Sequence, residues 1–165
     1  MRTAALLVAI AVALSGCGLR PLYGGGETGA VASGLRSVAV QPIAGQTGWL
    51  VRTALVDRLG DAGGSATRYR LEVELDEDLT GLGIRGDSAI TRERRTLRAR
   101  YRLVENSTGA VVLDATAGSD AGIDVVGSEY ATVAAEQSAA ERLSQVVADQ
   151  IVARLALFTS HQPPQ

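Results

Sequence analysis

Arginines occupy five even-numbered positions in an alternating stretch of this 165-residue chain: Arg92, Arg94, Arg98, Arg100 and Arg102. Because successive side chains of a β-strand point to opposite faces, these five would share one face, in a line about 35 Å long. A guanidinium binds phosphate or carboxylate groups through paired hydrogen bonds. The pattern is therefore the one feature of the chain whose residue types and spacing point to binding chemistry.

The arginines can instead pair with acids on a neighbouring strand, because an acidic alternation precedes them. A hairpin centred on Gly86 predicts three opposed pairs: Glu72 with Arg100, Glu74 with Arg98, and Asp76 with Thr96. Opposite charges across strands stabilise by about 0.2–1 kcal/mol per pair and neutralise each other. For Arg98, Arg100 and Arg102 we favour this charge ladder, with anion binding as the alternative.

Four arginines lie nearer the predicted turn, where the hairpin offers fewer acids. They are Arg85, Arg92, Arg94 and Arg95. These arginines can simply form a surface exposed to water. Unpaired guanidiniums would nevertheless be free to bind phosphate, so these four are the candidates for an anionic ligand.

The chain has few of the residues from which catalytic and metal sites are usually built. The only histidine is His161, close to the C-terminus, and the only cysteine is Cys17. A histidine-based triad or a zinc site therefore lacks its usual residues. The acidic run 76–78 alternates along a predicted strand and is typical of a solvated surface. We expect no enzyme activity, no metal and no cofactor other than lipid.

The elements that position the arginines follow from changes in hydrophobic period. They are a short strand at 38–43, a helix capped by Thr47 and running to Leu59 with Gly60 after it, strands at 68–79 and 88–104, a strand that begins with 111–117, and a helix at 128–158. Glycines at 81–87 indicate a hairpin turn or longer loop, and 106–109 a tight turn. The fold class is α+β, a two-layer sandwich of two helices on one face of a four-stranded sheet, in the order β-α-β-β-β-α.

The chain begins with a basic residue, an apolar stretch at 4–14 and small residues, a pattern typical of a signal peptide at 1–16. The next sequence, Leu14-Ser15-Gly16-Cys17, resembles the lipobox of bacterial lipoproteins. That resemblance implies cleavage before Cys17 and acylation of its thiol and new amine. Several acyl chains anchor a protein stably, so Cys17 is the predicted lipidation site. Gly18 follows it, and by resemblance this predicts the periplasmic side of the outer membrane.

The chain after the signal peptide divides into three parts. Residues 17–34 are glycine-rich, which predicts a lipidated, flexible tether. We expect residues 35–158 to form one domain and residues 159–165 to form a disordered tail.

The chain has 16 basic residues, all arginine, and 18 acidic residues. This balance gives no basic field to attract nucleic acid, and aromatic residues make up only 4%, too few for base stacking.

The run Cys17-Gly18-Leu19-Arg20-Pro21-Leu22-Tyr23-Gly24 resembles the start of the LptE family of lipopolysaccharide-assembly lipoproteins, in its alphaproteobacterial form, although Leu19 stands where the family often has Phe. The resemblance is most specific in this run. Weaker matches are Gln41-Pro42-Ile43, the glycines Gly45 and Gly48, the Asn106-Ser107-Thr108-Gly109 turn, and the alanine-rich helix from Glu129 to Leu155.

The resemblance implies a lipoprotein that plugs the LptD β-barrel as a heterodimer and helps this barrel assemble. Together they would insert lipopolysaccharide into the outer leaflet. It also implies contact with lipopolysaccharide and with outer-membrane lipid. An alternative is an auxiliary lipoprotein of an envelope ABC-type lipid transport system, which would share the anchor and an α/β domain.

Overall fold

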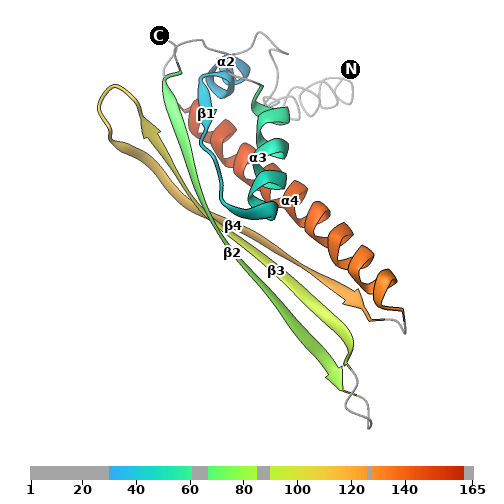
Figure 1. The fold of residues 1–165 in the computed structure, drawn as a ribbon. Coiled ribbons are helices and arrows are strands. Elements are labelled where there is room, and N and C mark those ends of the chain that lie inside the picture. The colour runs from blue at the N-terminus through green and yellow to red at the C-terminus, as the bar shows by residue number, and fades with distance from the viewer. Residues whose placement is uncertain (1–29, 61–66, 85–89, 126–127, 162–165) are drawn as a thin grey trace, which may run out of the picture.

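A computed structural model describes residues 30–60, 67–84, 90–125 and 128–161 of the chain. The helices and strands of this part are shown in Figure 1. In chain order they are α2 (Ala30–Arg36), β1 (Val38–Val40), α3 (Gly45–Leu59), β2 (Tyr69–Ile84), β3 (Ile90–Glu105), β4 (Val111–Asp124) and α4 (Glu129–Ser160). None of the described helices is both long enough and apolar enough to cross a membrane.

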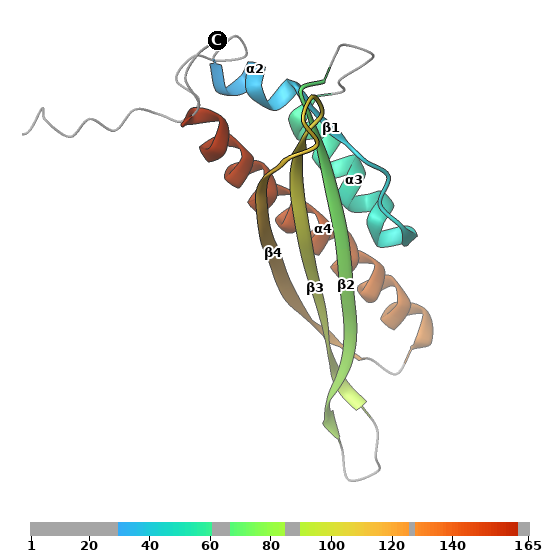
Figure 2. The same ribbon diagram turned by 90° about the vertical axis from the view of Figure 1, so that its left-hand side faces the viewer.

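The four strands form one sheet in the order β1-β2-β3-β4. β1 runs parallel to β2, whereas β2, β3 and β4 form an antiparallel meander. Helices α3 and α4 lie on the same side of this sheet (Figure 2). The predicted α+β sandwich and its element order are confirmed, with α2 as an additional short helix.

The hydrophobic core lies between the sheet and the helices. The sheet contributes buried odd-numbered residues, among them Leu71, Leu97, Tyr101 and Leu103. The helices contribute stripes at three- and four-residue spacing: Val51, Leu55 and Leu59 from α3, and Leu143, Val147, Ile151 and Leu155 from α4. Burial of each aliphatic side chain stabilises the fold by about 1.5–3 kcal/mol, so this packing, rather than helix propensity, fixes both helices on the sheet.

Helix α2 occupies the last part of the predicted tether. Leu35 is buried, and Gly34 packs so closely on α4 that an added Cβ would lie 3.0 Å from the side chain of Thr159. The tether prediction is therefore wrong for residues 30–34, because these contacts hold the segment in a helix against α4. Residues 1–29, which include the signal segment and Cys17, lie outside the described residues.

Helix α3 differs from the prediction at its start. It begins at Gly45, and the hydroxyl of Thr47 donates a hydrogen bond to Glu77 Oε2 at 2.9 Å instead of capping the helix. Its end is as predicted: Gly60 has a φ of 85°, a value that favours glycine, and its N–H donates to the Val56 carbonyl.

Helix α4 extends further than the predicted 128–158. Ser128 caps its start by accepting a hydrogen bond from the Ala131 N–H, and the helix ends at Ser160. The hydroxyl of Thr159 donates to the Ala156 carbonyl at 3.0 Å. Thr159 and Ser160 therefore belong to the helix and not to a disordered tail, while residues 162–165 lie outside the described part of the chain.

The strands of the meander are also longer than predicted. β2 and β3 have 16 residues each, and β2 continues through Gly81, which the sequence pattern places in a turn. β4 continues to Asp124, whereas the sequence pattern identified only its beginning, at residues 111–117. The turn between β3 and β4 lies where it was expected, with Gly109 at a φ of 71° and its N–H donating to the Glu105 carbonyl at 2.8 Å.

The register of the β2–β3 hairpin differs from the prediction by two residues. Glu72 pairs with Arg102, whereas a hairpin centred on Gly86 pairs it with Arg100. Because β2 continues through the glycines instead of turning at them, the midpoint between paired residues lies at position 87. A shift of two residues keeps every side chain on its predicted face, but it changes each cross-strand partner.

Candidate functional site: the charged face of the sheet

The five arginines predicted to share one face of β3 do so. They lie on the side of the sheet opposite to buried Leu97 and Tyr101, and no described helix covers that side (Figure 2). We call this surface the charged face; it consists of Arg92, Arg94, Arg98, Arg100 and Arg102 of β3, with Arg70, Glu72, Glu74 and Asp76 of β2 and Asp114, Asp120 and Asp124 of β4. The arginines thus form a central row between two acidic strands.

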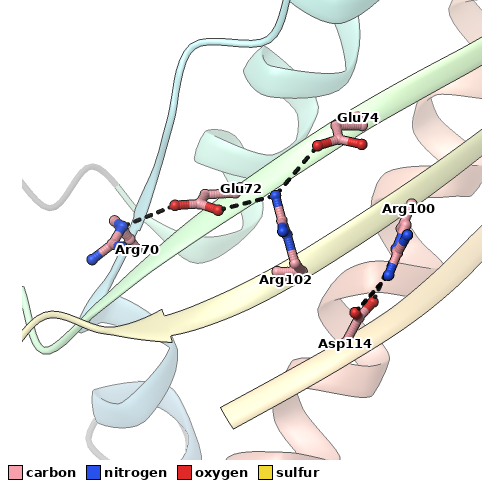
Figure 3. Close-up of polar contacts among 6 residues, drawn as sticks. All are labelled: Arg70, Glu72, Glu74, Arg100, Arg102 and Asp114. Carbon is pink, nitrogen blue, oxygen red and sulfur yellow. Dashed lines mark hydrogen bonds and ion pairs between the residues drawn. The ribbon is translucent and has the colours of Figure 1, made fainter. Parts of the chain in front are cut away.

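At one end of the charged face, ion pairs link β2 to β3 (Figure 3). Nη2 of Arg102 lies 3.3 Å from Glu74 Oε1 and 3.5 Å from Glu72 Oε2. The other oxygen of Glu72 accepts a hydrogen bond from Arg70 Nε at 2.9 Å. All four side chains are at least 34% exposed, so each pair stabilises the fold by only about 0–1 kcal/mol. Their main effect is to neutralise the surface.

Arg100 pairs with β4 instead of β2 (Figure 3). Its Nη2 and Nε donate to the two carboxylate oxygens of Asp114, at 2.9 and 3.3 Å. This side-chain hydrogen bond lowers the pKa of Asp114 below its ordinary value, and the positive charges of Arg100 and Arg102 lower that pKa further. The same contact raises the pKa of Arg100. The two groups therefore stay ionised together.

Arg98 lies across β4 and donates only to backbone. Its Nη1 donates to the carbonyls of Leu97 at 3.2 Å and Ser119 at 3.0 Å, and it forms no ion pair with any described residue. Its side chain passes over Gly118, where an added Cβ would lie 2.6 Å from the Arg98 Cδ. On the same glycine, the N–H donates to Gln150 Oε1 at 3.0 Å and the carbonyl accepts from Gln150 Nε2 at 3.3 Å, which ties β4 to α4.

Arg92 and Arg94, two of the predicted anion-binding residues, lie on the charged face near the hairpin end of the sheet. Nε of Arg92 lies 3.0 Å from Asp124 Oδ1, and Nε of Arg94 lies 3.9 Å from Asp120 Oδ2. The expectation that acids are scarce here is wrong, because β4 extends far enough to supply two. All four side chains are more than half exposed, so both guanidiniums remain accessible to a ligand.

Arg95 lies on the opposite side of the sheet, beneath the helices. Its Nε donates to Glu77 Oε1 at 2.5 Å, and its Nη1 donates to the Glu136 carbonyl of α4 at 3.1 Å. Its side chain is only 18% exposed and lines a cavity of about 180 Å³ with Thr47 and Val133. Arg95 thus joins the sheet to α4 and is not part of the charged face. Arg85, the fourth candidate, lies outside the described residues.

The charge ladder with the acids of β2, predicted for three arginines, is present only for Arg102, which pairs with Glu72 and Glu74. Arg100 pairs with Asp114 of β4 instead, and Arg98 forms no ion pair with any described residue. The sequence reasoning missed the acids of β4, Asp114, Asp120 and Asp124, which pair with three of the five arginines of the row. Their shared even-numbered spacing was a usable signal, but the prediction identified only the beginning of this strand, at residues 111–117.

Within the described part of the chain, no cluster of three or more His, Cys, Asp or Glu side chains is arranged to hold a metal ion. Members of the acidic run 76–78 have structural partners, since Glu77 contacts Thr47 and Arg95, and Asp78 accepts a hydrogen bond from Thr80. The geometry is that of an ionic contact surface.

Helices on one side of a four-stranded sheet, with the other side open and ion-paired, define a small two-layer α+β protein, and several solved bacterial lipoproteins share this fold. A Caulobacter crescentus CB15 protein described as a lipoprotein is 28% identical, with a TM-score of 0.67, over 81% of this chain and 100% of that one. Rare lipoprotein B from Shewanella oneidensis is 11% identical, with a TM-score of 0.56, over 74% and 96%. A minor lipoprotein from Acinetobacter baumannii is 14% identical, with a TM-score of 0.57, over 73% and 90%.

The family model for lipopolysaccharide-assembly proteins, LptE, matches residues 35–155. This match spans most of the chain, which therefore belongs to the LptE family. A comparison with curated protein sequences finds no significant match. Family membership confirms the resemblance seen in the sequence and supports a role for the chain in lipopolysaccharide assembly.

Proposed function

We propose that the mature chain is a lipid-anchored outer-membrane subunit of the lipopolysaccharide translocon. It faces the periplasm, is acylated at Cys17, and occupies the lumen of the LptD β-barrel. There it assists assembly of the barrel and plugs it while lipopolysaccharide passes to the outer leaflet. Membership of the LptE family over residues 35–155 supports this proposal, which assigns no catalytic step to the chain.

The observation that carries the proposal is the charged face, which is uncovered and yet largely paired within the protein. The interior wall of a wide membrane barrel is polar and often charged. Unpaired charges would lose hydration at such a contact, whereas pairs such as Arg100–Asp114 are already satisfied. An ionic surface of this kind suits packing against a polar wall better than binding of an apolar partner.

The same proposal assigns Arg92 and Arg94 to phosphate groups of lipopolysaccharide. Both side chains are more than half exposed, and each has only an exposed, exchangeable acid partner. Arg95 does not join them, since Glu77 and the Glu136 carbonyl engage it beneath the helices. The assignment of Arg85 to such a ligand stays a prediction.

Affinity purification of the tagged full chain from detergent-solubilised outer membrane tests this proposal. We expect recovery of a large β-barrel protein in equal amount. A Cys17→Ala variant is the matched control: it should leave the outer-membrane fraction while its folded domain is retained. Absence of a barrel from the wild-type eluate would overturn the proposal. Recovery of inner-membrane ABC transporter subunits instead would favour the alternative of an auxiliary lipid-transport lipoprotein.

A further inference from the structure

An apolar cavity lies between the last turns of α4 and the start of β4, on the helix side of the sheet. It has a volume of about 400 Å³ and is lined by Leu113, Arg154, Leu157, Phe158 and His161. That volume falls within the range of about 300–1,000 Å³ typical of small-ligand sites. Leu157 is 42% exposed, so an apolar ligand entering here would remove a water-facing leucine from solvent.

The cavity combines this apolar lining with an unpaired cation. Arg154 forms no hydrogen bond or ion pair with any described residue, unlike Arg92, Arg94, Arg100 and Arg102 of the charged face. Among the described residues its charge acts only on the uncharged Tyr101, where burial raises the pKa and Arg154 partly offsets that rise. A guanidinium without a partner beside an apolar cavity is complementary to an amphiphile with an anionic group. A wholly apolar ligand would leave this charge unused.

The position of the cavity indicates where such an amphiphile comes from. Helix α2 packs on the C-terminal end of α4, with Gly34 against Thr159 (Figure 1). The described chain therefore starts at the cavity's end of the molecule, with Ala30 only 13 residues after the predicted anchor Cys17. At about 3.3–3.6 Å per residue these span at most about 45 Å. The hairpin end of β2 and β3 lies at the opposite end of the sheet (Figure 2). The cavity is therefore at the end of the molecule where the described chain starts, the end closer along the chain to the predicted anchor.

We propose that this cavity receives one acyl chain of an anionic phospholipid from the leaflet that holds the anchor, with the phosphate at Arg154. Leu113, Leu157 and Phe158 surround the methylenes, and the guanidinium of Arg154 donates to phosphate oxygens. An acyl chain beside a phosphate also occurs in lipopolysaccharide, which the experiment separates from phospholipid. The inference rests on the anchoring part of the proposed function and does not require the barrel.

Photolabelling in barrel-free vesicles tests the inference. The lipidated full-length mature protein, with acylation verified by intact mass, is reconstituted with phosphatidylglycerol that carries a diazirine on one acyl chain. After irradiation, labelled residues are mapped by mass spectrometry. We expect label concentrated at Leu113, Leu157 and Phe158. Parallel vesicles carry diazirine-labelled lipopolysaccharide as the competing source.

Matched variants of α4 identify the cause of the labelling. Arg154→Gln should weaken the phospholipid affinity about tenfold, as expected for the loss of one charge-assisted hydrogen bond, and Leu157→Gln should also reduce labelling. Arg142→Gln, and Val146→Gln at a residue that is 41% exposed, should leave the labelling unchanged. Even labelling along α4, equal effects in test and control variants, or cavity labelling by lipopolysaccharide alone would overturn the proposal. If acylation is absent from the intact mass, the anchoring proposal itself fails, independently of the cavity result.

Discussion

At the residue scale, the arginines of the charged face make contacts of different kinds although they share one strand and one side. Arg100 makes two hydrogen bonds to Asp114, Arg102 bridges two glutamates, and Arg98 donates only to backbone carbonyls. Exposed pairs of this kind contribute little to the stability of the fold, because water screens the charges and pairing restricts two long side chains. Their importance therefore lies in how they distribute charge over the surface, more than in the free energy of unfolding.

The Asp114 carboxyl provides a pH test of these contacts. Its pKa is lower in the folded protein than the ordinary value of about 3.9, so its stabilising effect is present above that value and is lost as the pH falls through the lower, folded value. We expect Arg100→Gln to raise the pKa of Asp114 in an NMR titration of side-chain carboxyls. Arg92→Gln, which removes a partner of Asp124, should leave Asp114 unchanged. An unaltered Asp114 titration in Arg100→Gln would contradict the assignment.

At the element scale, Gly118 joins an edge strand to its neighbours on both sides. β4 is the last strand of the sheet, and an edge strand normally exposes unpaired backbone groups to other chains. At Gly118 the backbone N–H and carbonyl are both bound by Gln150 of α4. The Arg98 side chain fills the space that a Cβ at position 118 would occupy. The absence of a Cβ is thus what allows Arg98 to cross β4.

We expect Gly118→Ala to lower the free energy of unfolding by about 1–3 kcal/mol, the usual cost of overpacking. Its Cβ would lie 2.6 Å from the Arg98 Cδ and 2.9 Å from the Leu97 carbonyl oxygen. Gly122→Ala is the matched control in the same strand and on the same face, where an added Cβ meets nothing within 4 Å. That variant should be neutral or slightly stabilising, because alanine restricts the unfolded chain. Urea unfolding of both proteins measures the difference, and equal losses would refute the explanation.

At the scale of the whole molecule, two separate surfaces are available for binding. The charged face lies on the side of the sheet that the helices leave uncovered (Figure 2), and the apolar cavity lies on the helix side, between the end of α4 and the start of β4. The first suits polar walls and phosphate groups, and the second suits an acyl chain. A contact on the charged face therefore does not compete with an acyl chain in the cavity.

Charge reversal tests the lipopolysaccharide contact. The double variant Arg92→Glu/Arg94→Glu should reduce the lipopolysaccharide retained in a pull-down by at least about tenfold, because two phosphate contacts become repulsive. Arg100→Glu is the control, because Arg100 lies on the same face but its guanidinium is already paired with Asp114. Circular dichroism verifies that each variant is folded. Unchanged retention by the double variant would discard Arg92 and Arg94 as ligand residues.

Much of the fold could be predicted from periodicity. The alternation of β3 separates Leu97 and Tyr101 from the even-numbered arginines whatever the register, and the stripe of α4 identifies its buried side. The odd number of Arg95 already indicated that it lies away from Arg92 and Arg94, although the sequence reasoning grouped them. Local pattern thus determined which side of each element is buried.

Only the tertiary structure decided which side chains meet. A shift of two residues between β2 and β3 preserves both faces, so alternation could not choose between Arg100 and Arg102 as the partner of Glu72. The pairing of the β4 acids with the arginines likewise depends on contacts between separate elements. So does the formation of helix α2, where Gly34 packs against Thr159. Side-chain direction follows from local backbone geometry, whereas pairing depends on the packing of the whole chain.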